Sequence, residues 1–449
     1  MGRMTRRAAE RGALPAALGA ALLALCGLGR AAAPPEPRPS AGAVRGQSVQ
    51  HISVWMHQGG DGAEFSAVRR AADAFNRGQR AYRVDLAAAS YTGNYTERVH
   101  GAAATGTLPC LLEFDGPYLY GFAWRGYLQP IDRYMPRTLL DDVLPSVIAQ
   151  GTYDGRLYSL GQFESGLGLW GNRAHLRAAG VRIPTFARPW TLAEFERALE
   201  RLGAVAGVDY PLDMSFYASL GEFYSYAYAP LLQGFGGDLI ERRHYRSAKG
   251  VLDGAASVAA MRHLQRWLAR GWTRVVQDRA DDFARRRAAL LWNGHWHYPA
   301  LRKALGDDLL LLPLPDFGRG SKTATGSWNW GITASCPFPA GAGAFLAHLM
   351  STAEVLRISN ANGAIPARRS SLARSPLYGA GGPLRLYARQ ISAGRGITRP
   401  VTPAYEAIGR AFSQAVGAIA AGGDAQAELS KAAAAIDRDL AAHRHYPLR

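Results

Sequence analysis

The stretch "HISVWMHQGGDGAEFSAVRRAADAFN", residues 51–76, carries the pattern of a strand, a glycine-rich loop and a helix. Ile52 and Val54 alternate with less apolar residues, which is typical of a strand with one buried face. Four apolar residues then recur at helical spacing: Phe65, Val68, Ala72 and Phe75. The pattern therefore predicts a βα unit near the start of the folded part.

Further strands, separated by helical or loop sequence, extend this order along the chain. They are predicted over "YRVDLA" (82–87), "LPCLLEF" (108–114), "DLLLLPLP" (308–315) and "WGITAS" (330–335). The leucine run of the third predicts a buried strand. Strands alternating with helices indicate an α/β fold, in which ligands lie on loops at the carboxyl ends of the strands.

Two capping boxes predict where helices begin. Thr191 and Glu194 have the required spacing before an apolar helical pattern, and Ser351 and Glu354 repeat it. A last helix is predicted over residues 424–442. We find no repeat of fixed period and no long linker in the middle of the chain.

The composition argues against nucleic-acid binding despite a formal net charge of +17 over 449 residues. Only four of the 52 basic residues are lysines, and the arginines are spread along the chain, with residues 285–287 as the densest run. A nucleic-acid site would gather such charges along one groove between aromatic residues. The length fits two or three domains, or one large two-lobed body.

The N-terminal segment predicts export. A basic start, an apolar run and Ala31–Ala33 describe a secretory signal peptide over residues 1–33, followed by a flexible leader over 34–50. A periplasmic, soluble product is therefore expected, because no later apolar run is long enough to span a bilayer. Arg6 and Arg7 hint at twin-arginine export. Leu25 stands before Cys26 where lipoprotein sites carry a small residue, which argues against lipidation.

Two cysteines, Cys110 and Cys336, remain after such a cleavage. An oxidising compartment permits them to pair, but sequence alone leaves their geometry open. No C-x-x-C motif supports a redox or zinc-ribbon function.

Seven segments in order carry a resemblance. They are residues 71–76, 106–132, 151–184, 188–199, 288–296, 312–335 and 361–370. Together they resemble the extracellular solute-binding proteins of carbohydrate ABC transporters, the group that includes maltose-binding protein. One departure is Cys110, where relatives have aspartate after the proline of this strand.

The resemblance implies a two-lobed periplasmic-binding-protein fold of type II, with the ligand in a cleft between the lobes. Lobe I would comprise residues 51–161 and 325–362, and lobe II residues 162–324 and 363–449. Three hinge crossings are implied near residues 161–165, 316–325 and 362–366. The partners implied are a small carbohydrate and the transmembrane permease subunits of an ABC transporter. We expect a monomer, no cofactor and no catalysis.

The stretch "LLWNGHWHYP", residues 290–299, concentrates tryptophan, histidine and asparagine. A metal site at His295 and His297 would need further ligands, and none accompanies them. Nucleic-acid stacking would need interleaved basic residues. Two alternatives stay open here: the tryptophans are ordinary core, or they form a wall that packs on the C–H face of a sugar while amides bind its hydroxyls.

The sugar interpretation selects a set of candidate ligand-binding residues, some from their chemistry and some from the resemblance. They are Gln58, Glu64, Asp115, Tyr118, Glu164, Trp170, Trp292, Asn293, Trp296, Trp328, Asn329, Trp330 and Arg368. By resemblance, Trp296 matches a stacking aromatic and Glu164 lies near the ligand. Glu64 can instead favour a helix N-terminus, and Arg368 can equally be a surface charge.

Two other functions remain as alternatives. The same fold would bind glycerol 3-phosphate or a related phosphodiester if arginines formed an anion site in the cleft. A glycoside hydrolase would use two carboxylates such as Asp115 and Glu164 as acid and nucleophile. Neither alternative has a localised signal in the sequence, and which sugar binds cannot be predicted.

Overall fold

The βα unit predicted over residues 51–76 is present as strand β1 (Gln50–Met56) and helix α1 (Ala63–Gly78). The computed structural model describes residues 48–60, 62–89, 95–216, 221–275 and 281–448. The predicted signal peptide and the Cys26 site lie outside the described residues. Most of the predicted leader does too, although its last residue, Gln50, already belongs to β1.

The first sheet has five strands in the order β2-β1-β3-β13-β6. Besides β1 these are β2 (Tyr82–Ala88), β3 (Leu111–Asp115), β13 (Trp328–Ile332) and β6 (Ser159–Leu160). Strand β1 pairs in parallel with β2 and β3, and β13 pairs antiparallel to β3. Apolar side chains of these strands are buried against α1, α12 (Pro339–Leu349) and α13 (Thr352–Asn362). We call the residues packed around this sheet lobe I.

The second sheet has four strands in the order β11-β8-β10-β9. They are β8 (Leu167–Asn172), β9 (Tyr210–Asp213), β10 (Ala288–Gly294) and β11 (Leu309–Leu312). Strand β11 was predicted to be buried, but it is an edge strand with three half-exposed leucines, because only β8 pairs with it. We call the residues packed around this sheet lobe II.

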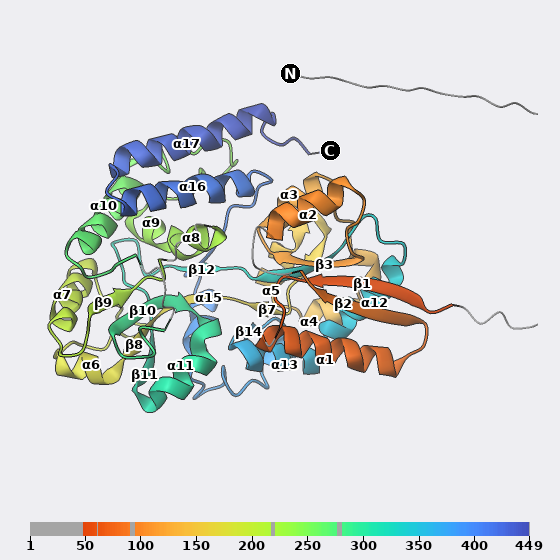
Figure 1. Cartoon of the computed structure of the whole chain (residues 1–449), viewed down its shortest axis with the longest axis horizontal. Coiled ribbons are helices and arrows are strands. Elements are labelled where there is room, and N and C mark those ends of the chain that lie inside the picture. Colours follow the sequence, from red (N-terminus) through yellow and green to blue (C-terminus); the bar gives the residue numbers. More distant parts are fainter. Residues whose placement is uncertain (1–47, 61, 90–94, 217–220, 276–280, 449) are drawn as a thin grey trace, which may run out of the picture. The chain divides into compact units, whose positions relative to one another are not determined.

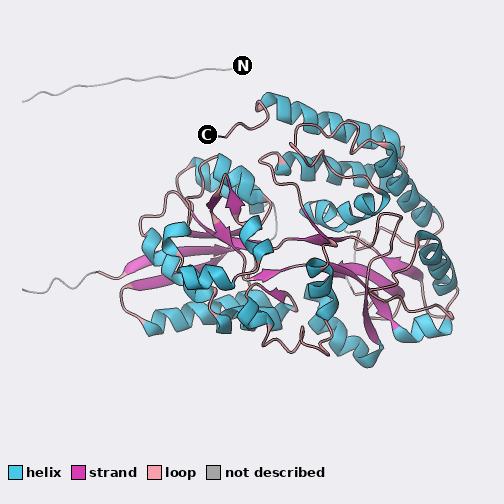
Figure 2. Cartoon of the chain, turned by 180° about the vertical axis from the view of Figure 1, so that it is seen from behind, coloured by secondary structure: helices cyan, strands magenta, loops and turns pink. Residues whose placement is uncertain are grey.

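Helices cover the second sheet and extend lobe II. They include α7 (Leu192–Gly203), α8 (Glu222–Ala227), α9 (Ala229–Phe235), α10 (Ala255–Ala269), α16 (Tyr405–Ala420) and α17 (Ala425–Ala442). Both views show α16 and α17 side by side (Figures 1 and 2). Asp424 caps α17, so the helix predicted over residues 424–442 is confirmed.

The chain passes between the two sheets through short extended segments. Strand β7 (Phe163–Glu164) follows β6 and pairs antiparallel to β14 (Ile365–Pro366), so two of the predicted crossings are hydrogen-bonded to each other. The second predicted crossing, near residues 316–325, contains β12 (Thr323–Thr325), which pairs with β15 (Gly396–Thr398). Because of this pairing, the chain enters the first sheet only after residues 326–327.

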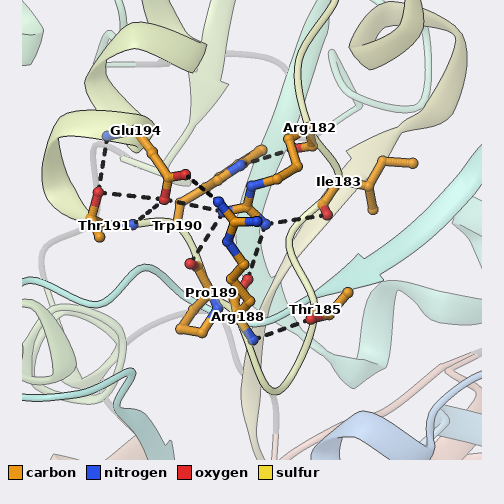
Figure 3. Close-up of polar contacts among 8 residues, drawn as sticks. All are labelled: Arg182, Ile183, Thr185, Arg188, Pro189, Trp190, Thr191 and Glu194. Atoms are coloured by element: carbon orange, nitrogen blue, oxygen red, sulfur yellow. Dashed lines mark hydrogen bonds and ion pairs between the residues drawn. The ribbon is translucent and has the colours of Figure 1, made fainter.

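Helix α7 begins at a complete capping box. The Thr191 hydroxyl accepts from the backbone N–H of Glu194, and the Glu194 carboxylate accepts from the Thr191 N–H. Figure 3 shows Arg182 beside this cap, donating to Glu194 and to the carbonyls of Arg188 and Pro189. The first predicted capping box is therefore confirmed, and Arg182 fixes the loop that leads into it.

The second predicted capping box is only half formed. Ser351 caps α13 by accepting from the Glu354 N–H, but the Glu354 carboxylate pairs with Arg357 one turn further on. Arginine competes successfully for the carboxylate because the ion pair is charge-assisted.

A disulfide joins Cys110, at the start of β3, to Cys336, which follows β13. Both cysteines are buried in lobe I beside the paired strands. The bond answers the question of pairing that the sequence left open.

Candidate functional site

Three strand ends of lobe I bring together the residues of the candidate site. His57 directly follows β1, Asp115 ends β3, and Trp328 begins β13. In the antiparallel pairing of β3 and β13, Trp328 lies opposite Asp115. An aromatic ring and a carboxylate therefore stand side by side at one edge of the sheet, which is where α/β folds carry their ligands.

The indole of Trp328 packs face to face on the imidazole of His57. Their ring centroids are 3.4 Å apart and their planes differ by 6°. Tyr95 meets the same indole edge-on, with centroids 6.3 Å apart. The imidazole Nδ1 and the backbone N–H of His57 both contact Oε2 of Glu113, at 2.6 and 3.0 Å. Trp328 itself remains half-buried.

Asp115 is bound by Arg399, which follows β15 in lobe II. Arg399 donates from Nη1 and Nη2 to the two carboxylate oxygens, at 2.6 and 2.7 Å. Its Nη1 also donates to Glu222 in the first turn of α8. The Arg399 side chain is 4% exposed, so this ion triad is largely removed from water.

The surroundings of Arg399 favour its charged form. Burial lowers the pKa of Arg399, but the charges of Asp115 and Glu222 outweigh burial and raise that pKa above its ordinary value. Burial also raises the pKa of Glu222, against the opposing effect of the Arg399 charge. Tyr405 donates to Glu222, and Ser225 does so at 2.8 Å. Arg399 is thus a permanent cation between two carboxylates.

An aromatic pair adjoins Arg399 on the lobe II side. The guanidinium lies 4.9 Å from the ring centroid of Tyr226, and the rings of Tyr226 and Trp296 are 6.2 Å apart. Trp296 is half-buried. Within the described part of the chain, the buried Tyr226 hydroxyl and Arg399 Nε have no hydrogen-bond partner.

Glu164 is a fully buried carboxylate between the lobes. It accepts from the backbone N–H of Gly326 at 2.7 Å, from the Ser165 N–H at 3.0 Å and from Gln150 Nε2 at 2.5 Å. Burial raises the pKa of Glu164, and these hydrogen bonds act in the opposite direction. The Glu164 carboxylate therefore joins the segment that contains β7 to the segment between β12 and β13.

Two predicted polar residues lie at the start of α1. Glu64 accepts from Asn362 at 3.1 Å through Oε1, while its buried Oε2 has no partner among the described residues. Burial raises the pKa of Glu64, which the neighbouring His57 charge partly offsets. Gln58 is half-buried in the loop before α1. Tyr118, on α3 (Tyr118–Trp124), packs edge-to-face on Tyr405 of lobe II, with centroids 5.7 Å apart.

Three of the predicted tryptophans are core residues. Trp170, Trp292 and Trp330 are each at most 1% exposed. Their indole N–H groups donate within the protein, to the carbonyls of Gly294 and Ala227 and to the Gln162 side chain respectively. The expectation that they line a ligand surface is corrected, because in this structure none of them has a free face or a free N–H.

Three predicted polar residues, Asn293, Asn329 and Arg368, bond to other groups within the protein. Asn293 is buried and bonds Ser215 at 2.7 Å, and the buried Asn329 donates to the Ser327 carbonyl at 3.3 Å. Arg368 pairs with Asp142 at 2.7 Å within lobe I. These three residues have internal partners that account for their polarity.

The stretch 290–299 divides at Gly294. Strand β10 ends there, and residues 295–297 form a single 3₁₀ turn. A side chain at Gly294 would collide with the Trp296 ring, which a Cβ would approach within 2.1 Å. Trp296 and His297 therefore lie in this turn and not on a strand, because β10 has already ended. His295 bonds Ser165 and the Asn362 carbonyl, at 2.9 Å each.

Four site residues were missed by reasoning from the sequence: His57, Glu222, Tyr226 and Arg399. His57 directly follows a predicted strand, which was a usable signal. Glu222 and Tyr226 share helix α8, but Arg399 lies far from them in the chain and stands among many other arginines.

Among the described residues, 48–448 with their gaps, no helix is long and apolar enough to cross a membrane. Over the same residues no group of three or more histidines, cysteines or carboxylates is arranged to hold a metal ion.

Comparison with known proteins gives a consistent result. A family model described as "Bacterial extracellular solute-binding protein" matches residues 70–380. A lipoprotein of Streptomyces antibioticus, described as uncharacterized, is 29% identical over 117 residues, which span 26% of this chain and 26% of that protein.

Solved structures share the fold at low identity. The GacH receptor of Streptomyces glaucescens, determined unliganded and with acarbose, is 20% identical with a TM-score of 0.73, covering 89% of this chain and 98% of its own. The cyclic alpha-maltosyl-1,6-maltose binding protein of Arthrobacter globiformis is 20% identical with a TM-score of 0.71, covering 87% and 99%. An ABC substrate-binding protein of Listeria monocytogenes with cycloalternan is 17% identical with a TM-score of 0.74, covering 88% and 99%. The fold is that of periplasmic binding proteins.

Proposed function

The chain belongs to the bacterial extracellular solute-binding proteins, and we propose that it captures a carbohydrate for an ABC importer. Members of this family bind solutes and are not enzymes, so the chain is a receptor. In the proposed cycle, both lobes contact the sugar, the protein closes, and the loaded form docks on membrane permease subunits.

One observation carries the carbohydrate assignment. Two half-buried indoles lie near the Asp115–Arg399–Glu222 triad: Trp328 of lobe I is opposite Asp115 in the strand pairing, and Trp296 of lobe II packs near Tyr226, the ring over which Arg399 lies. A pyranose offers apolar C–H faces that pack on indoles, and hydroxyls that bind carboxylates and guanidinium groups. The site supplies both types of contact close together.

The ligands of similar structures support the same class. Those structures are described with acarbose, cycloalternan and mannotriose, all bound by proteins of this fold. An oligosaccharide or a glycoside is therefore the first candidate for this chain.

The charge of the site disfavours the phosphodiester alternative. Asp115, Glu222 and Glu64 contribute three carboxylates, and Arg399 is shared between two of them. A phosphate bound at that arginine would meet these carboxylates at short range and be repelled by them. A neutral sugar can accept from Arg399 and donate to the carboxylates without that repulsion.

A hydrolase is disfavoured by the same contacts. Asp115 is held by Arg399, and Glu164 is occupied by three hydrogen-bond donors. Neither carboxylate is poised to deliver or take a proton at a sugar.

Export and assembly complete the proposal. Removal of residues 1–33 would release the protein into the periplasm, as the N-terminal pattern predicts, without a lipid on Cys26. We propose a monomer whose partners are the sugar and the permease.

Isothermal titration calorimetry against mono-, di- and trisaccharides, with glycerol 3-phosphate as the competing candidate, tests the function. We expect stoichiometric binding of at least one saccharide and no turnover of it. The variant Asp115→Asn should bind that saccharide more weakly, while Asp142→Asn, which changes a lobe I carboxylate outside the site, should not. Binding of glycerol 3-phosphate alone would overturn the carbohydrate assignment.

A further inference from the structure

The contact between His57 and Trp328 is closer than ordinary aromatic packing. Aromatic pairs in proteins usually have centroids about 4.5–7 Å apart in offset or edge-on arrangements. Here the rings overlap face to face at 3.4 Å with nearly parallel planes. Tyr95 closes on an edge of the indole. One face of the Trp328 indole is therefore packed against His57, which directly follows β1.

His57 is itself held from two directions by one oxygen. Oε2 of Glu113 contacts both the backbone N–H and the ring Nδ1 of His57. Glu113 lies in β3, is 1% exposed, and its carbonyl accepts from the Tyr95 hydroxyl at 2.6 Å. The imidazole plane is thus determined by β1 and β3, and it transmits that orientation to the first residue of β13.

Burying the His57–Glu113 pair costs desolvation free energy, which makes the pair an unusual support for the Trp328 ring. His57 and Glu113 are both almost completely buried, and apolar residues of similar volume would commonly give equal or greater stability there. Burial lowers the pKa of His57, but Glu113 opposes it, aided by Glu64 and Asp115, and the net effect raises that pKa. A buried ion pair in such a position is better explained by orientation than by stability.

We infer that His57, oriented by Glu113, is a positioning residue that fixes the Trp328 indole as the lobe I platform for the ligand. This inference rests on the proposed function, because the platform is the one on which a sugar ring would pack. A ring already fixed before binding loses little side-chain entropy when the ligand arrives. Neither His57 nor Glu113 needs to touch the ligand.

The test separates ring orientation from affinity. The difference in near-ultraviolet circular dichroism between wild type and Trp328→Phe isolates the band of this indole, whose intensity requires a fixed environment. Affinity is measured by calorimetry with the saccharide that binds wild type best. The variants are His57→Ala, His57→Gln and Glu113→Gln, and His263→Ala is the matched control because His263 also pairs with a glutamate beside a tryptophan, in lobe II.

We expect His57→Ala to lose the Trp328 band and to bind roughly 3- to 10-fold more weakly, as fits the entropy of one immobilised side chain. His57→Gln, whose planar amide can still donate to Glu113, should restore most of both signals. Glu113→Gln should keep the band, since its amide oxygen can still accept from His57. His263→Ala should alter neither signal. If His57→Ala fails to fold, His57→Leu, which fills the space but cannot bond Glu113, carries the test with the same expected losses.

Two outcomes overturn the inference and differ from failure of the proposed function. An unchanged Trp328 band and unchanged affinity in His57→Ala would remove the positioning role, while sugar binding by wild type would stand. A lost band with unchanged affinity would show that Trp328 is oriented by His57 but is not the platform. A wild-type protein that binds no saccharide would overturn the proposed function and the platform with it.

Discussion

Arg399 donates hydrogen bonds from Nη1 and Nη2 to the two carboxylate oxygens of Asp115, a residue 284 positions earlier in the sequence. The pair links the end of β3 in lobe I to the segment after β15 in lobe II. Because this geometry is bidentate, a lysine cannot reproduce it.

We expect Arg399→Lys and Arg399→Ala to weaken sugar binding and to destabilise the protein, the alanine variant by up to about 3 kcal/mol, since the partly buried Asp115 and Glu222 would remain close together without their cation. Urea denaturation and calorimetry measure the two effects. Arg368→Ala is the matched control, because it breaks another inter-segment pair, with Asp142. Equal losses of affinity in Arg368→Ala and Arg399→Ala would show that the triad has no special role.

Trp296→Ala should reduce sugar affinity by about 1–3 kcal/mol, roughly 5- to 150-fold, through loss of the aromatic contact. His297→Ala, from the same 3₁₀ turn, should cost little binding. Trp292→Phe should lower the melting temperature and leave affinity intact, because Trp292 is core. A destabilised Trp296→Ala protein with unaltered affinity would contradict the stacking role.

The structure also shows where the sequence was informative. The alternation in β1 and the helical spacing in α1 depend on neighbours in the chain, so local patterns predicted them correctly, as they did the Thr191 cap. Trp292 and Trp296 have similar neighbours in the sequence, yet Trp292 is buried and Trp296 is half-buried. The difference arises because β10 ends at Gly294, between them.

The ion triad could not be predicted for a different reason. Its members come from β3, from the start of α8 and from the residue after β15, and nothing near Arg399 in the sequence distinguishes it from other arginines. Long-range pairing of this kind depends on the packing of whole elements. The position of Asp115 at the end of a predicted strand, by contrast, suggested that residue without specifying its partner.

Asp213 makes folding stability depend on pH. Burial, and secondarily the nearby Asp282 charge, raise its pKa to about 6 from an ordinary value of 3.8. The folded state therefore binds the proton more tightly than the unfolded state, so this contribution is complete below pH 3.8 and is lost as the pH rises through 6. The loss amounts to about 3 kcal/mol.

We expect Asp213→Asn to remove that dependence, so that its advantage over wild type grows between pH 4 and pH 7. Its Oδ1 can still accept from the Ser215 N–H, as Asp213 does at 2.7 Å. Urea denaturation at several pH values measures the difference. Parallel curves for the two proteins would mean that Asp213 titrates normally.

Removing the disulfide with Cys110→Ala and Cys336→Ala should lower the free energy of unfolding by about 2–5 kcal/mol, since the bond closes a long loop in the unfolded chain. Sugar affinity should change little, because the bond lies at the opposite end of β3 from Asp115. Thermal unfolding with and without reductant provides an independent check. A variant as stable as wild type would show that packing of β3 and β13 suffices.

Ligand contacts in both lobes predict a more compact protein when the sugar is bound. Small-angle scattering should give a smaller radius of gyration at saturating saccharide. An unchanged profile with a verified ligand would argue against hinge closure, and Trp328→Ala with Trp296→Ala provides a protein that should not respond.

The disulfide has a consequence for how the protein can be cut. Cys110 and Cys336 are 226 positions apart, and the covalent ring they close contains all four strands of the second sheet and both chain passages through residues 161–166 and 313–327. A protease that nicks an exposed loop inside this ring leaves both fragments tethered. They would migrate as one species on a non-reducing gel and separate only when the bond is reduced. Cleavage outside the ring, in contrast, gives two species on the same gel without reduction.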